Sequence, residues 1–300
     1  MQEQTHCGVV AVLGASNVGK STLVNYLVGA KVSIVSPKVQ TTRSRVRGIV
    51  VQDNTQIVLI DVPGIFKPKR RLDRAMISTA WTEAVDADEC LLLIDAKKGI
   101  DEDTQRIIDT LQTQKRQVIL VLNKIDMIAK TKLLPLLDQL KSYSVFKETF
   151  MISAKTGQNI KELLSYLVSV MPQGAFMYPQ ESISDLPDAL FCAEITREKL
   201  FFNLQQELPY SVAVHTTSFK KNPQKNDIRI EQTIFVERDG QKAIIIGNKG
   251  QMLKKIGEAS RREMSKIFEC PVHLFLFVKV QENWINDPER YKEWGLDFNA

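Results

Sequence analysis

Cysteine and histidine are scarce in this 300-residue sequence. The four cysteines, Cys7, Cys90, Cys192 and Cys270, lie far apart, and no pair has the spacing of a metal or redox motif. We therefore expect free thiols in a reducing compartment rather than a disulfide framework. The three histidines are too scattered to suggest a metal site.

Long apolar runs are also absent. None approaches the roughly 20 residues that a membrane-spanning helix needs, and the start, MQEQTHCGVVAVLG, lacks the basic and apolar regions of a secretory signal. These absences favour a cytoplasmic protein. The hydrophobic content of 44% is sufficient for about two domains that each bury a core.

Positive charge is concentrated late in the chain, although the net charge is only +5. Residues 242–266 contain seven Lys or Arg against two Glu, whereas residues 176–300 as a whole contain 17 basic and 18 acidic side chains. Such a local concentration indicates an anionic partner at that place better than the overall charge does.

The first half of the chain alternates apolar runs with helical patterns. Continuous apolar strands separated by helices predict an α/β fold, with a mostly parallel sheet and helices on both faces. The expected strands lie within residues 7–14, 55–64, 89–96, 116–126 and 148–157.

Composition changes at a stretch rich in proline, PQGAFMYPQESISDLPDA. The sequence predicts a domain over residues 1–172, a linker over 173–187, an α+β domain over 188–284 and a tail over 285–300. In the second domain we expect a long helix, two strands, a short strand leading to Gly247, a helical region and a last strand, VHLFLFVKV.

The stretch GASNVGKST matches G-x-x-x-x-G-K-[ST] and lies between a predicted strand and a predicted helix. The glycines let backbone amides surround phosphate oxygens at the helix N-terminus. Lys20 brings positive charge to the β- and γ-phosphates, and the Ser21 hydroxyl can ligate Mg²⁺. We predict that a nucleoside triphosphate binds to Gly14, Ala15, Ser16, Asn17, Val18, Gly19, Lys20, Ser21 and Thr22.

Three further motifs, DVPG, NKID and SAK, end predicted strands and together favour guanine. Asp61 can hold Mg²⁺, and Gly64 can offer its N–H to the γ-phosphate. The Asp126 carboxylate can accept from two adjacent N–H groups of guanine, a pair that adenine lacks. The additional predicted nucleotide-binding residues are Asp61, Val62, Pro63, Gly64, Asn123, Lys124, Asp126, Ser153, Ala154 and Lys155.

This set of motifs resembles the small GTPases of the translation-factor-related superclass. The resemblance implies GTP and GDP as ligands, Mg²⁺ as cofactor and hydrolysis of GTP to GDP and phosphate. PKVQTTRSRVRGIV resembles the first switch region of the Era-like branch, in which a threonine closes over Mg²⁺. Thr41 and Thr42 both fit, and Thr42, just before Arg43, is favoured. The implied Mg²⁺ ligands are Ser21, Thr42 and Asp61, and the implied catalytic residues are Lys20, Gly64 and Thr42.

Two positions bear on the rate of hydrolysis. Ile65 stands where Ras-type enzymes place a glutamine that orients the attacking water, and isoleucine cannot hydrogen-bond a water. We therefore expect intrinsic hydrolysis to be slow or to be helped from elsewhere. In several Era-like relatives, an asparagine at the position of Asn17 binds a potassium ion that bridges the phosphates, which implies K⁺ as a further cofactor. The alternative is that Asn17 only shapes the loop.

A second glycine loop, GNKG, fits the G-X-X-G loop of KH domains, which clamps the backbone of single-stranded RNA. The order of its surroundings, helix–strand–strand–helix–helix–strand, resembles that of type II KH domains. The alternative is an ordinary turn beside a solvated basic helix. The predicted RNA-binding residues are Gly247, Asn248, Lys249, Gly250, Lys254 and Lys255.

The combination resembles bacterial Era-type GTPases over essentially all 300 residues. The resemblance implies a monomer that binds small-subunit ribosomal RNA near its 3′ end and acts in assembly and maturation of the small ribosomal subunit. One alternative is a constitutive RNA-binding protein with a vestigial nucleotide domain, which intact Lys20 and Asp126 oppose. The other is a membrane-associated GTPase. No apolar or amphipathic anchor supports it, and weak peripheral association at the inner face of the cell membrane stays open.

Overall fold

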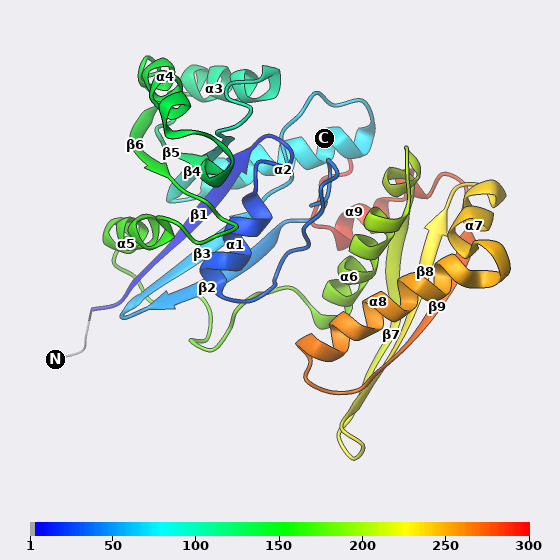
Figure 1. Cartoon of the computed structure of the whole chain (residues 1–300). Helices are drawn as coiled ribbons and strands as arrows, with labels where there is room; N and C mark the ends of the chain where they lie inside the picture. Colours follow the sequence, from blue (N-terminus) through cyan, green and yellow to red (C-terminus); the bar gives the residue numbers. More distant parts are fainter. Residues whose placement is uncertain (1–3) are drawn as a thin grey trace. The chain divides into compact units, whose positions relative to one another are not determined.

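The computed structural model describes residues 4–300, which form two compact units (Figure 1). The first unit contains the residues up to Asp185 together with Tyr291–Ala300, and the second contains Leu186–Arg290. The chain therefore leaves the first unit, forms the second and returns to the first.

A six-stranded sheet forms the centre of the first unit and confirms the predicted, mostly parallel α/β fold. Its order is β2-β3-β1-β4-β5-β6, and every neighbouring pair is parallel except β2 and β3. Consecutive residues Leu91 to Ile94 are fully buried, so both faces of the sheet are covered. The strands are β1 (His6–Gly14), β2 (Val46–Gln52), β3 (Thr55–Asp61), β4 (Glu89–Asp95), β5 (Val118–Asn123) and β6 (Phe146–Met151).

Helices connect most of these strands, and specific residues mark where the helices begin and end. Helix α1 lies between two glycines with positive φ, Gly19 and Gly29, and α3 begins where the Asp101 carboxylate accepts the Thr104 N–H at 2.9 Å. The helices are α1 (Lys20–Val28), α2 (Arg71–Asp86), α3 (Glu102–Thr113), α4 (Lys130–Lys141) and α5 (Ile160–Val170), with a 3₁₀ turn η1 (Ile125–Met127).

Strand β2 was not predicted. Its sequence, VRGIVVQ, has arginine and glycine at its start and so lacks the continuous apolar run of the other strands. Gly48 is required there, because a Cβ on it would lie 2.7 Å from Val28 and 2.9 Å from Val24 of α1. Close packing of α1 on this strand therefore explains a residue that weakens the sequence pattern.

The second unit has a three-stranded sheet in the order β7-β8-β9, antiparallel between β7 and β8 and parallel between β8 and β9. Apolar residues of α6, α7 and α8 pack with the inward side chains of the strands. The helix–strand–strand–helix–helix–strand order is the one that the resemblance to type II KH domains implies, but the element-by-element prediction differs from it at one point. The elements are α6 (Asp188–Asn203), η2 (Leu208–Ser211), β7 (Ala213–Asn222), β8 (Asp227–Val236), α7 (Asp239–Ile246), η3 (Asn248–Gly250), α8 (Gln251–Ile267), β9 (Val272–Val280), η4 (Trp284–Asn286) and α9 (Pro288–Glu293).

The short strand predicted just before Gly247 is wrong, because these residues end helix α7. Gln241 caps the helix, since its side-chain oxygen accepts from the N–H groups of Glu237 and Arg238 at 2.8 and 3.2 Å. Ile245 is completely buried and Ile244 is 58% exposed. The sequence did not reveal this helix because its last four residues, Ala243 to Ile246, are all apolar and show no alternation between a buried and an exposed side.

The unit boundaries also differ from the predicted linker and tail. Residues 173–185 belong to the first unit, where the Gly174 N–H donates to the Thr5 carbonyl at 3.0 Å and the Tyr178 N–H donates to the Gln56 side chain at 3.0 Å. Backbone and side-chain hydrogen bonds thus hold a proline-rich stretch whose composition is typical of a linker. At the other end, the Phe298 ring lies 4.5 Å from the Arg71 guanidinium.

All four cysteines are free, as predicted, and Cys7, Cys90 and Cys192 are buried. Burial raises the pKa of the Cys192 thiol to about 12, so this side chain acts as a small apolar group. Across residues 4–300, no helix combines the length and the apolar character needed to cross a bilayer.

Candidate functional site

The loop between β1 and α1 has a backbone that only glycine adopts easily at two points. Gly14 and Gly19 have φ of 147° and 105°. A Cβ on Gly19 would lie 2.3 Å from the Asn123 side-chain nitrogen, and one on Gly14 would lie 2.6 Å from the Leu93 carbonyl oxygen. The loop therefore lies directly against the ends of two neighbouring strands.

Lys20 is buried at the centre of this loop. Its Nζ donates to the carbonyl oxygens of Gly14 and Ala15 at 3.1 and 3.0 Å. Burial lowers the pKa of Lys20 to about 8, and the nearby Asp61 carboxylate partly opposes this effect. A phosphate at the loop would stabilise the charged form, which is the electrostatic role predicted for this lysine.

The three predicted Mg²⁺ ligands lie together. The Asp61 Oδ2 atom accepts from Ser21 Oγ at 2.6 Å and from Thr42 Oγ1 at 3.4 Å, and the two hydroxyl oxygens are 3.1 Å apart. Ser33 Oγ also donates to Asp61 Oδ2, at 2.6 Å. Ser33 was missed because it matches no motif in the sequence.

The structure separates the two candidate threonines. Thr42 is buried beside Ser21 and Asp61, whereas the Thr41 hydroxyl donates to the Lys38 carbonyl at 2.7 Å and lies 2.6 Å from Ser36 Oγ. This arrangement favours Thr42 over Thr41 as the residue near a cation.

The donor set fits magnesium. Asp61 Oδ1 is buried without a hydrogen-bond partner among the described residues, and all the surrounding donors are the hard oxygens that Mg²⁺ prefers. Burial raises the pKa of Asp61, against hydrogen bonds from Ser21 and Ser33 and the charge of Lys20. A divalent cation held by Ser21, Thr42 and Asp61 would stabilise the ionised carboxylate.

Two predicted residues join the far end of the loop to strand ends. Asn123 donates from Nδ2 to the Val18 carbonyl at 2.8 Å and accepts at Oδ1 from the Ala154 N–H at 2.9 Å. Lys124 Nζ donates to the Asn17 carbonyl at 2.6 Å and pairs with Asp95 at 2.7 Å. Asp95, at the end of β4, was missed because no motif surrounds it.

The residues predicted to meet the base surround this junction. Asp126 lies in η1 with an exposed side chain, Ser153 and Ala154 are buried, and Lys155 is exposed. The exposed Asp126 carboxylate is thus available to accept hydrogen bonds from a ligand.

The segment after β3 approaches the loop closely. A Cβ on Gly64 would lie 2.7 Å from Ser16 Oγ, which is buried and unpaired among the described residues. The Ile65 N–H donates to the Gly14 carbonyl at 3.1 Å, and the Ile65 side chain is buried. Ile65 is therefore held in place by packing and offers no polar group to a water molecule. Val62 and Pro63 are buried in the same segment.

Asn17 lies at the rim of the loop with φ of 63°. Its Nδ2 donates to the Pro37 carbonyl at 2.8 Å, and within the described residues its Oδ1 accepts no hydrogen bond. That oxygen therefore has free hydrogen-bonding capacity at the rim of the loop.

The second glycine loop is exposed in the second unit. Gly247, Lys249 and Gly250 have φ of 71°, 48° and 78°. The side chains of Asn248 and Lys249 are exposed, and Lys254 and Lys255 are exposed on the first turns of α8. The side chains of all four non-glycine residues predicted to bind RNA are thus accessible, and three of them are lysines.

Sequence comparisons identify both domains. A family model described as 50S ribosome-binding GTPase matches residues 9–124, and a KH domain model matches residues 207–285. The GTPase Era of Afipia carboxidovorans is 54% identical over 300 residues, which are 99% of this chain and 97% of that protein. The chain belongs to the GTPase Era family. As an Era-family member it is a GTP-hydrolysing enzyme that carries a KH domain. A second relative, the GTPase Era of Mesorhizobium japonicum, is 55% identical over 294 residues.

Two solved Era structures are similar over nearly the whole length. One, in complex with MgGDPNP and nucleotides 1506–1542 of 16S ribosomal RNA, has a TM-score of 0.91 and 40% identity, and covers 97% of this chain and 99% of that one. The other, a single-residue variant of Aquifex aeolicus Era bound to GDP and AlF₄⁻, has a TM-score of 0.91 and 39% identity over the same shares.

The two glycines of the exposed loop differ in their surroundings. A Cβ on Gly247 would lie 2.7 Å from the Met252 Cβ and 3.0 Å from its nitrogen, whereas a Cβ on Gly250 meets nothing within 4 Å. Both residues have positive φ, so either substitution costs roughly 1–3 kcal/mol of strain. We expect Gly247→Ala to lower the free energy of unfolding of the second unit by about 1 kcal/mol more than Gly250→Ala. Denaturant titration of the two variants checks this, and equal losses would contradict it.

Proposed function

We propose that this GTPase uses GTP binding and hydrolysis to control binding of the 3′-end region of small-subunit ribosomal RNA, and that it acts in assembly and maturation of the small ribosomal subunit. The observation that carries the proposal is the presence, in one chain, of a complete set of nucleotide-site residues and an exposed, basic G-X-X-G loop. A 40% identical relative with matching length binds both a GTP analogue and 16S ribosomal RNA. We place the chain in the cytoplasm as a monomer, and membrane association forms no part of the proposal.

In the proposed reaction, the first unit positions the triphosphate and stabilises charge. Lys20 leaves the carbonyl oxygens of its own loop to meet the β- and γ-phosphates, while loop N–H groups surround the phosphates. Ser21, Thr42 and Asp61 would hold Mg²⁺, which would supply positive charge to the phosphate oxygens. The Gly64 N–H contacts the γ-phosphate, so the segment that follows β3 responds to the presence of that phosphate.

Hydrolysis and RNA binding are linked through ordered segments. The γ-phosphate orders residues of about 36–47 and 61–75, and its loss releases them. In the second unit, Gly247 and Gly250 allow a phosphate backbone to come close, and Lys249, Lys254 and Lys255 supply positive charge. RNA affinity then depends on which nucleotide the first unit holds.

Gly250→Asp tests the RNA interface. Aspartate tolerates positive φ better than most residues but places a negative charge beside RNA phosphates. We expect it to weaken binding of a single-stranded oligonucleotide with the ribosomal 3′-end sequence by roughly tenfold or more, measured with GDPNP and with GDP. Gly250→Asn, which has similar size and no charge, should weaken binding less. Wild-type affinity that ignores the nucleotide would favour a constitutive RNA-binding protein, and no RNA binding at all would remove the RNA role.

Asp126→Asn tests the base specificity. The substitution exchanges one acceptor oxygen for a donor, so the residue no longer accepts from both guanine N–H groups. We expect GTP affinity to fall roughly 10- to 100-fold, the range for a charged hydrogen bond, and affinity for xanthosine triphosphate to rise. Asp138→Asn, at an exposed position on α4, is the matched control. Unchanged preference for GTP in the Asp126 variant would remove this residue from base recognition.

We also propose that potassium assists hydrolysis at Asn17. A monovalent cation beside the Oδ1 oxygen of Asn17 would stabilise negative charge on the phosphates in the transition state, which the apolar Ile65 side chain cannot do. GTP turnover in potassium should exceed that in sodium by roughly tenfold or more. Asn17→Gly keeps the positive φ and should remove the difference. Equal rates of the wild-type protein in the two salts would contradict this role and leave the other site residues unaffected.

A further inference from the structure

The second unit has two covalent connections to the first, one ending at Asp185 and one starting at Tyr291. Any influence of the nucleotide on RNA binding that passes through the polypeptide must use these connections. The contacts that hold them within the first unit are therefore of interest.

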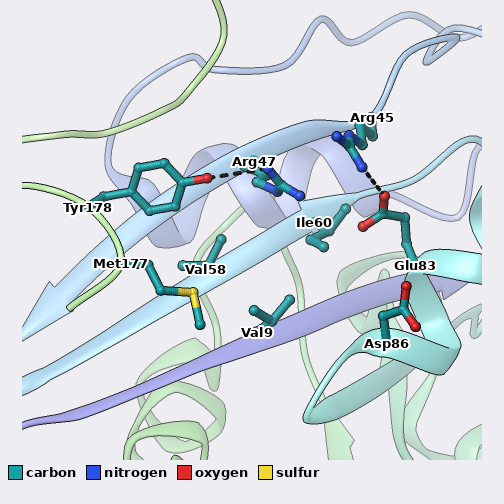
Figure 2. A pocket seen from close by; sticks show the side chains of 9 residues that line it. All are labelled: Val9, Arg45, Arg47, Val58, Ile60, Glu83, Asp86, Met177 and Tyr178. Carbon is teal, nitrogen blue, oxygen red and sulfur yellow. Dashed lines mark hydrogen bonds and ion pairs between the residues drawn. The ribbon is translucent and has the colours of Figure 1, made fainter. Parts of the chain in front are cut away.

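Strand β2 follows directly on the loop that contains Thr42. Arg45 immediately precedes this strand, and Arg47 is its second residue. Both side chains line a pocket of about 390 Å³. Figure 2 shows them above Val9, Val58 and Ile60, which line the same pocket. The two arginines diverge, Arg45 toward α2 and Arg47 toward Tyr178.

Arg45 connects the two segments next to the nucleotide site. Its Nη1 lies 2.5 Å from Oε1 of Glu83, on α2, and the Glu83 side chain is only 10% exposed. A partly buried pair is weakened less by solvent than a surface pair. The end of the loop before β2 and the helix after Gly64 are thus joined by this ion pair.

Arg47 holds the outgoing connection. Its Nη1 donates to the Tyr178 hydroxyl at 3.3 Å and to Asp185 Oδ2 at 3.1 Å. Burial alone would lower the pKa of Arg47. The hydrogen bonds and charge interactions with Tyr178 and Asp185 together outweigh this effect, so the pKa of Arg47 is raised. Backbone pairing supports the same attachment, since the Ile49 N–H donates to the Ile183 carbonyl at 2.9 Å.

The returning connection meets the same two segments. The Phe298 ring lies 4.5 Å from the guanidinium of Arg71, the first residue of α2. A Cβ on Gly295 would lie 3.6 Å from Arg45 Nε, so the chain passes close to that side chain. Both connections are therefore attached to β2 or α2, which adjoin the loops that we propose respond to GTP.

We infer that Arg45 and Arg47 are positioning residues that transmit the nucleotide state from β2 and α2 to the two connections of the RNA-binding unit. This inference rests on the proposed function, because it requires RNA affinity to depend on the nucleotide. A shift of β2 moves the Arg47 contact with Asp185, and a shift of α2 relative to β2 acts through Arg45 and Glu83.

A double-mutant cycle at Arg47 and Asp185 tests the inference. The measured quantity is the ratio of RNA dissociation constants with GDP and with GDPNP, using the ribosomal 3′-end oligonucleotide. Allosteric effects are usually roughly 5- to 150-fold, and we expect Arg47→Gln and Asp185→Asn each to reduce the effect at least threefold. The double variant should lose no more than the single variants, because both remove one contact. GTP turnover without RNA should stay within twofold of wild type.

Arg106→Gln is the matched control. Arg106 also pairs with carboxylates, Glu102 and Asp103, but both lie on its own helix α3. It should leave the nucleotide effect unchanged. Charge exchange at the second pair, Arg45→Glu with Glu83→Arg, should restore an effect that either substitution alone reduces.

The outcomes separate the two proposals. A wild-type ratio near one would overturn the proposed function and the inference with it. A wild-type nucleotide effect that survives in Arg47→Gln, or losses that add independently in the double variant, would overturn the inference alone. The cycle compares the loss of the nucleotide effect in the single variants with that in the double variant. It therefore still tests the coupling of Arg47 and Asp185 where one variant also lowers stability.

Discussion

The buried carboxylate of Asp61 is the interaction on which the first unit depends. Its Oδ2 atom accepts hydrogen bonds from the hydroxyl groups of Ser21 on α1, of Ser33 and of Thr42. Three separate segments of the chain therefore converge on one atom. The other oxygen has no partner among the described residues. A buried, incompletely paired carboxylate is costly unless positive charge approaches it. The arrangement thus makes the order of the surrounding loops sensitive to a cation and to the phosphates that accompany it.

Much of the fold and of the nucleotide site could be predicted because both obey simple patterns. Parallel strands buried on two faces appear as apolar runs, and their motifs collect at one edge of the sheet. Ser33 and Asp95 could not be predicted, because hydrogen bonds formed across sequence distances of 28 and 29 residues leave no local signal. Strand β2 was missed because arginine and glycine interrupt its apolar pattern. Helix α7 was missed because its unbroken apolar run shows no helical periodicity.

The two glycine loops use the same backbone freedom for different purposes. Around Lys20 the chain encloses a buried cationic side chain, and substituents on Gly14 or Gly19 would collide with neighbouring strands. Around Lys249 the loop projects outward, and Gly250 has open space beside it. A closed loop suits one compact ligand, whereas an open one suits a polymer that enters and leaves at both sides. Their geometry therefore distinguishes them better than their sequences do.

The return of the chain to its first unit has a consequence for biosynthesis. Chains emerge from the ribosome beginning at the N-terminus, and domains generally fold in that order. Here Phe298, whose ring packs on Arg71, is made only after all of the second unit, Leu186–Arg290. The GTPase unit cannot complete its own packing until the whole KH domain has been translated, so the surface around α2 stays unfinished until then.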